Sequence, residues 1–319
     1  MARLLKREIN FLKYRKAFFI IAATLILIAL VALPVRGLNF GIEFVGGSSV
    51  DFKDTGAITE EQMRDAFVSA GSEAPIVQST TSTQDGTRGF IVRIAETDPQ
   101  VTNEIKAQVA AAFGLDIASI EVNIVGPGWG QQVTRTSAIA FIVAIALIII
   151  YIAIRFEYKM GVTAVLTLIH DLVIILGVYA ILGREVTPNV VAALLTIMGY
   201  SLYDTVVVFH RINDNLATTA NHSFMTVANH SVNQVFTRTI NTTLTSLIPV
   251  LAMLFFGGET LRDFAFAMAI GLVLGSYSSI ALASPFYAIW KQREPKYKKL
   301  AGKYGEGLDE FTVAEQLGS

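Results

Sequence analysis

One acid and one base stand out because each lies within or directly beside a long apolar run: Asp204 and Arg238. Tyr200 precedes Asp204 by one helical turn, and Asn241 and Thr242 follow Arg238 by one turn, so polar side chains share a helical face with both. Apolar surroundings favour the neutral form of a carboxyl group, whereas a nearby guanidinium favours the charged form. Movement of Arg238 toward or away from Asp204 would therefore expel or admit a proton.

The same two residues could instead form a static ion pair that fixes the register of two helices. Arg238 alone could also extend its side chain to the inner headgroups of a membrane. Ionisable groups inside membrane spans usually have a function, so we prefer the interpretation as a proton switch.

The adjacent residues His170 and Asp171 are a second candidate site near the middle of another apolar run. Successive side chains on a helix diverge by about 100°, so we expect that the two cannot both face one partner. A proton path and a structural hydrogen-bonded role are equally supported for this pair.

The composition explains why these charges are unusual. Of 319 residues, 53% are apolar and 16% are charged, and the mean hydropathy is +0.53. Soluble chains carry about 45–50% apolar and about 25% charged residues, so a disordered chain, a coiled coil and an ordinary cytosolic enzyme are excluded. The net charge of −1 leaves no basic surface for nucleic acid, and the absence of cysteine excludes disulfides and thiolate metal sites.

Membrane-spanning helices must position the candidate residues, and each needs about 20 mostly apolar residues. Six stretches qualify: 17–35, 136–154, 161–182, 188–209, 239–256 and 264–290. The first is longer than the apolar part of a signal peptide and is interpreted as an uncleaved anchor. In the sixth, Gly271, Gly275 and Ser279 form a ridge of small residues that predicts close helix packing. The polar segment 210–237, with three of the four histidines in no zinc-binding spacing, is expected to be a solvated loop, with room for one amphipathic helix on the membrane surface, and no metal site.

Lysine and arginine are concentrated before the first span, between the second and third, and after the sixth. Such residues mark the cytoplasmic side, so both termini are expected there: a basic N-terminus over 1–16 and a C-terminal tail over 291–319. The long segment 36–132 then lies on the other side of the membrane.

This outer segment has the pattern of a compact α/β domain. Strand patterns occur at 47–53, 76–81, 90–95 and 119–125. Helices are predicted to begin after Thr59, the first residue of a capping box, and after Asp98, which precedes a proline. The order βαββαβ is that of a ferredoxin-like domain. The expected fold is an α-helical polytopic membrane protein with six transmembrane helices and this domain between the first two.

Four motifs resemble those of the SecD/SecF family of protein-export membrane proteins. The first is the signature Gly41-Ile42-Glu43-Phe44-Val45-Gly46-Gly47, in which Glu43 replaces the usual aspartate. The others are His170-Asp171, the stretch from Gly199 to Ile212 around Asp204, and Thr237-Arg238-Thr239. The single modest outer domain is more similar to SecF than to SecD.

The resemblance implies a subunit, not an enzyme, that pairs with SecD in a twelve-span assembly of the RND type. Such an assembly works with the SecYEG channel, with YajC and YidC as further partners, in the inner (plasma) membrane. It uses the proton gradient, or sodium in some members, to drive late export of preproteins after the motor SecA, and needs no cofactor besides that ion. The resemblance also implies that Asp204, Arg238 and Thr242 are the ion-coupling residues.

Two other functions stay open on the residues alone. A proton-coupled RND-type small-molecule exporter would need the same acid, although such exporters carry two halves and two large outer domains. An intramembrane aspartyl protease would need Asp204 and Asp171 as its two carboxylates. The chain lacks a Gly-x-Gly-Asp motif, and the two aspartates differ in depth by about 9 Å, which argues against a protease.

Overall fold

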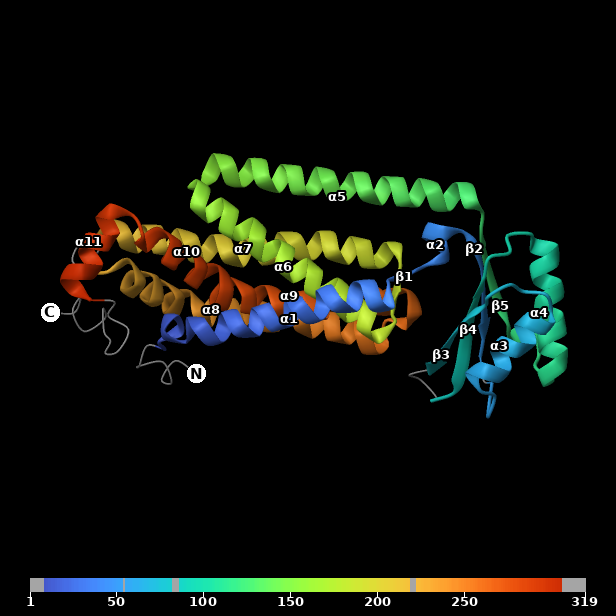
Figure 1. The fold of residues 1–319 in the computed structure, drawn as a ribbon. Helices are drawn as coiled ribbons and strands as arrows, with labels where there is room; N and C mark the ends of the chain where they lie inside the picture. Colours follow the sequence, from blue (N-terminus) through green and yellow to red (C-terminus); the bar gives the residue numbers. More distant parts are fainter. Residues whose placement is uncertain (1–8, 54, 82–85, 219–221, 306–319) are drawn as a thin grey trace. The chain divides into compact units, whose positions relative to one another are not determined.

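The computed structural model describes residues 9–53, 55–81, 86–218 and 222–305 (Figure 1). These residues divide into two compact units. The first unit comprises the described residues up to Leu38, Ile142–Arg184, and those from Asn189 onward; the second comprises Asn39–Phe141 and Glu185–Pro188. The start of the predicted basic N-terminus and the end of the predicted tail lie outside the described residues.

Within the described residues, six helical segments are long and apolar enough to cross a membrane, as predicted. They are η1 (Phe11–Tyr14) with α1 (Arg15–Arg36); α5 (Pro127–Arg155); α6 (Tyr158–Leu182); α7 (Pro188–Thr218); α8 (Phe224–Phe256); and a run through α9 (Gly258–Ser278), the π-helical turn η3 (Ser279–Ala283) and α10 (Ser284–Gln292). A short helix, α11 (Pro295–Tyr304), follows.

The prediction of a solvated loop over 210–237 is wrong, because α7 continues to Thr218 and α8 already begins at Phe224. Polar side chains of the two helices bond to each other there: Asn215 donates to Ser231 Oγ at 2.8 Å. The Ser223 hydroxyl caps α8 by accepting from the Thr226 amide. The polarity that indicated a loop instead supplies contacts between helices.

Small residues bring the helices of the first unit close together. A Cβ on Gly177 of α6 would overlap Ala29 of α1, and one on Gly271 of α9 would overlap Ile197 of α7. At Gly275 a Cβ would lie 3.0 Å from the Ser201 Cβ. The predicted packing role of the small-residue ridge is therefore confirmed, and the ridge holds α9 against α7.

The second unit contains a four-stranded antiparallel sheet in the order β3-β4-β2-β5. Its elements are β2 (Gly47–Phe52), α3 (Glu60–Ser69), β3 (Ile76–Thr81), β4 (Arg88–Ile94), α4 (Pro99–Phe113), η2 (Ile117–Ser119) and β5 (Glu121–Val125). This order and connectivity are those of a ferredoxin-like fold, as predicted. The capping box at Thr59 forms, since its side chain accepts from the Gln62 amide while the Gln62 side chain accepts from the Thr59 amide.

Two further pieces of the second unit lie far apart in the sequence. Strand β1 (Asn39–Phe40), which precedes the short helix α2 (Ile42–Val45), pairs in parallel with β6 (Glu185–Val186). Since β6 lies between α6 and α7, the connection between these two helices belongs to the unit that holds the sheet. No local pattern in the sequence predicts this pairing.

Candidate ion-coupling site

Asp204 is buried on α7, with 4% of its surface exposed. Among the described residues its carboxylate takes part in no hydrogen bond or ion pair. A buried carboxylate without partners is costly in its charged form, because the surroundings do not replace the water it has lost. Asp204 is therefore suited to hold and release a proton.

Arg238 lies on α8 and approaches α7 at Tyr203, the residue that precedes Asp204. Its guanidinium, however, donates to the Tyr203 hydroxyl at 2.7 Å and lies 5.9 Å from the centre of that ring. The structure thus brings the predicted acid and base into one region without a direct ion pair. Thr242 follows on the next turn of α8, and its hydroxyl donates to the carbonyl oxygens of Arg238 at 3.0 Å and Thr239 at 2.9 Å.

The α8 face that carries Arg238 points out of the first unit. Asn241 and Thr245 are exposed on it, and so is Tyr203 on the neighbouring α7. A charged and amide-bearing face is unfavourable in contact with lipid. This outward polar face, formed by Tyr203, Arg238, Asn241, Thr242 and Thr245, is called the polar face below.

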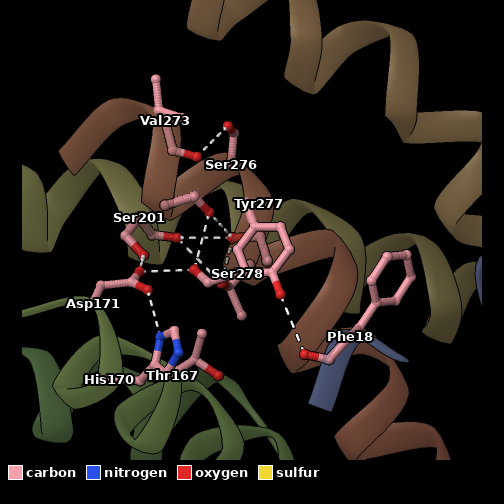
Figure 2. Close-up of polar contacts among 12 residues, drawn as sticks. Phe18, Thr167, His170, Asp171, Ser201, Val273, Ser276, Tyr277 and Ser278 are labelled. Carbon is pink, nitrogen blue, oxygen red and sulfur yellow. Dashed lines mark hydrogen bonds and ion pairs between the residues drawn. The ribbon is translucent and has the colours of Figure 1, made fainter. Parts of the chain in front are cut away.

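His170 and Asp171 lie deep in the same unit (Figure 2). Asp171 is fully buried, and its Oδ2 accepts from the hydroxyls of Ser201 on α7 and Ser278 on α9, both at 2.7 Å. His170 Nδ1 lies 3.1 Å from Asp171 Oδ1. The two neighbours thus contact each other, which the sequence did not predict, and no third side chain among the described residues bonds to both.

A second hydroxyl pair lies beside this cluster. Thr205 Oγ1 and Ser279 Oγ are 2.8 Å apart, and both donate to the Ser201 carbonyl oxygen, at 3.1 and 3.3 Å. Sequence reasoning missed these hydroxyls, because serine and threonine are common in membrane helices and only the packing of α7 on α9 brings them together. The small-residue ridge was the one available signal.

The signature glycines and Glu43 belong to the second unit. Gly41 donates its amide to Val186 of β6 at 3.0 Å, and a Cβ there would overlap the Glu43 carboxylate and lie 2.8 Å from Glu185 Oε1. The buried Arg93 of β4 lies 3.4 Å from that same Glu185 oxygen. The signature therefore makes room for carboxylates at the β1–β6 junction.

Gly47 has a different reason to be glycine. Its φ of +118° is rarely adopted by other residues, and a Cβ would overlap the Ile94 carbonyl oxygen of the adjacent strand. Phe44, in α2, packs edge to face on Phe40 with ring centres 5.9 Å apart. The signature thus shapes the entry into the sheet. Within the described residues no group of three or more His, Cys, Asp or Glu could hold a metal.

Comparison with known proteins decides the family. Residues 104–293 match the family "Protein export membrane protein SecD/SecF, C-terminal", and residues 31–53 match the "SecD/SecF GG Motif" family. The chain belongs to the SecF family of protein translocase subunits. It is thus similar to transport components of the Sec pathway rather than to enzymes, and it is a multi-pass membrane protein.

Curated relatives agree with the family models. The chain is 37% identical over 299 residues to the protein translocase subunit SecF of Streptomyces coelicolor, covering 91% of this chain and 79% of that protein. It is 35% identical to SecF of Alicyclobacillus acidocaldarius, covering 92% and 96% of the two. A crystal structure of SecDF from Thermus thermophilus, a translocon-associated membrane protein, superposes with a TM-score of 0.82 at 31% identity. The superposition covers 91% of this chain and 40% of the SecDF chain.

Proposed function

We propose that this chain pairs with SecD and uses the proton motive force to drive late, SecA-independent stages of protein export through SecYEG. The observation that carries the proposal is Asp204, a buried carboxylate without a hydrogen bond among the described residues, beside an arginine that is held by Tyr203 instead. Moving Arg238 onto Asp204 would stabilise the charged carboxylate, and withdrawing it would favour proton uptake. The coupling residues are Asp204, Arg238 and Thr242.

The polar face supports the pairing with a second membrane protein. Arg238, Asn241 and Thr245 cannot be left against lipid without cost, so another transmembrane helix must cover them. SecDF of Thermus thermophilus aligns with 87% of this chain at 36% identity. The alignment covers only 38% of SecDF, so the unmatched part of SecDF is longer than the matched part. We propose that SecD supplies the missing helices, and that YajC, YidC and exported preproteins are further partners.

Proton is the preferred coupling ion and sodium the alternative. A proton needs only the carboxylate of Asp204, whereas a sodium ion needs several oxygen ligands around it. No other cofactor is proposed. The Lys and Arg distribution supports cytoplasmic termini in the inner (plasma) membrane, with the sheet of the second unit on the opposite side.

The protease alternative loses support from the contacts of Asp171. Its carboxylate is occupied by Ser201, Ser278 and His170, whereas an aspartyl dyad requires two carboxylates that share a proton. A small-molecule exporter is the remaining alternative, and a defect confined to exported proteins would argue against it.

The test is protein export in cells that carry Asp204→Asn, with and without a collapsed proton gradient. This substitution keeps the side-chain shape and removes titration. We expect the variant to export like wild type without a gradient, and collapse to add no further defect. Asp214→Asn, an exposed aspartate on the same helix, is the matched control and should behave as wild type. Normal, gradient-sensitive export in the Asp204 variant would contradict the proposal.

A further inference from the structure

We propose that His170 and Asp171 form a second proton-binding centre, and that its charge determines how firmly α7 is held to α6 and α9. This centre is separate from Asp204, because the described contacts of Asp171 are with His170, Ser201 and Ser278 and do not include Asp204. Its link to export rests on the proposed function, but its protonation does not. The close-up in Figure 2 shows the carboxylate between residues of three helices.

Charge balance is the first argument. The polar groups that face Asp171 are His170 on its own helix, Ser201 on α7, and Ser278 and Tyr277 on α9. The Tyr277 hydroxyl donates to the Phe18 carbonyl oxygen at 3.2 Å. None of the lysines or arginines that the structure describes contacts the carboxylate. An ionised Asp171 beside a neutral His170 therefore leaves one buried negative charge, and a single proton neutralises the pair.

The unpartnered nitrogen of His170 is the second argument. With Nδ1 donating to Asp171, Nε2 carries a lone pair, and this buried atom has no hydrogen-bond partner among the described residues. A proton can therefore be held on the imidazole or on the carboxylate, so the pair can bind it as one unit. This differs from Asp204, whose neighbour Arg238 is permanently charged.

The serines connect this proton to the packing of the helices. Hydrogen bonds to an ionised carboxylate are shorter and stronger than those to a neutral one, so Ser201 and Ser278 fasten α7 and α9 to α6 while Asp171 is charged. Protonation of the pair weakens this attachment. Ser201 lies one helical turn before Asp204 and Thr205, so a loosened α7 carries the coupling acid with it.

The π-helical turn η3 lies directly after these contacts. It begins at Ser279, the residue after Ser278, and Ser284 donates to the Ser279 carbonyl oxygen at 2.8 Å, five residues back. Single π-turns inside α-helices are rare and occur frequently at functional sites. The charge of Asp171 thus acts where α9 is least regular.

The test is an infrared pH titration of the full chain, assembled with SecD in membrane vesicles. It follows the C=O stretch of protonated carboxyl groups in an Asp204→Asn background, where Asp204 cannot contribute. We expect one buried carboxyl still to titrate, and to be lost when Asp171→Asn is added. A titration that Asp171→Asn leaves intact would overturn the proposal, whatever the export assay shows for Asp204.

A second pair of variants keeps the test valid if Asp171→Asn fails to assemble. Ser201→Ala removes one donor to the ionised form, so the titration midpoint should rise by about one pH unit. Ser276→Ala is the matched control, because that hydroxyl donates at 3.0 Å to the Val273 carbonyl of its own helix and does not contact the cluster (Figure 2). Equal midpoints in the two variants would show that Ser201 does not hold the ionised carboxylate, and would overturn the proposed link between this proton and the packing of the helices.

Discussion

At the scale of single residues, the proposed coupling acid, Asp204, and Arg238 are close but unpaired. Arg238 donates to the Tyr203 hydroxyl at 2.7 Å, and Asp204 has no hydrogen bond among the described residues. Tyr203 is adjacent to Asp204 in sequence, so α7 itself offers the guanidinium two alternative positions, one on the hydroxyl and one on the carboxylate. Export would use the change between them.

Tyr203→Phe tests this choice, since it removes the hydroxyl and keeps the ring that Arg238 approaches. Arg238 should then spend more time on Asp204, and a carboxylate nearer to a guanidinium binds a proton only at lower pH. We expect gradient-dependent export to require a more acidic outer pH, by about one unit if one hydrogen bond to a charged group is lost. Export measured against outer pH checks this, and an unchanged profile would show that Tyr203 does not hold Arg238 in the functional cycle.

The sequence identifies some of the site residues and not others. Asp204, Arg238 and Thr242 could be proposed as candidates because charges in apolar runs are rare and helical spacing places their neighbours. Ser201, Ser278 and the contact between His170 and Asp171 could not, because they depend on side-chain rotamers and on helices that are distant in sequence.

At the scale of elements, the contact of α9 on α7 positions the hydroxyl cluster. Gly275 packs on Ser201, where an added Cβ would lie 3.0 Å from the Ser201 Cβ and 3.2 Å from its Cα. Neither neighbour is the free end of a flexible chain, so the helices must separate to accept a methyl group. The ridge is therefore needed for the bonds from Ser201 and Ser278 to Asp171.

Gly275→Ala should destabilise the membrane unit by about 1–3 kcal/mol, the usual cost of overpacking a close contact. Gly302→Ala is the control: this glycine lies in α11 with nothing near its added Cβ. Thermal unfolding in detergent measures both. A Gly275 variant as stable as the Gly302 variant would mean that α7 and α9 can separate freely.

Local sequence signals predicted the helices and strands of the second unit well. They did not predict that α7 and α8 extend into the polar segment 210–237. The capping box at Thr59 and the Asp98-Pro99 start act within one turn of the chain, so they can be recognised in sequence. The extension of α7 and α8 through 210–237 depends on contacts such as Asn215 with Ser231, which become visible only when the helices are paired. The pairing of β1 with β6 is likewise non-local.

At the scale of the whole molecule, the chain connects the sheet-bearing unit to the helix that carries Asp204. Glu185 and Val186 pair with β1, Glu185 contacts the buried Arg93, and α7 begins two residues after β6. Movement at the start of α7 must therefore be transmitted to β6. This continuity gives the proposed proton binding at Asp204 a covalent route to the sheet-bearing unit.

The polar face predicts where the partner lies. The chain has no cysteine, so single cysteines report one position each. Thr245→Cys on α8 should cross-link to cysteines introduced into SecD, whereas Ile142→Cys, 67% exposed on α5, should not. Equal cross-linking from both positions, or cross-linking from Ile142 alone, would place SecD elsewhere.

The most direct measurement is proton movement itself. The chain and SecD would be reconstituted with SecYEG and SecA in vesicles, and inward proton flow would be recorded during export of a preprotein. We predict proton flow that depends on the preprotein in wild type and in Asp214→Asn, and none in Asp204→Asn. Undiminished proton flow in the Asp204 variant would contradict the assignment of Asp204 as the coupling acid.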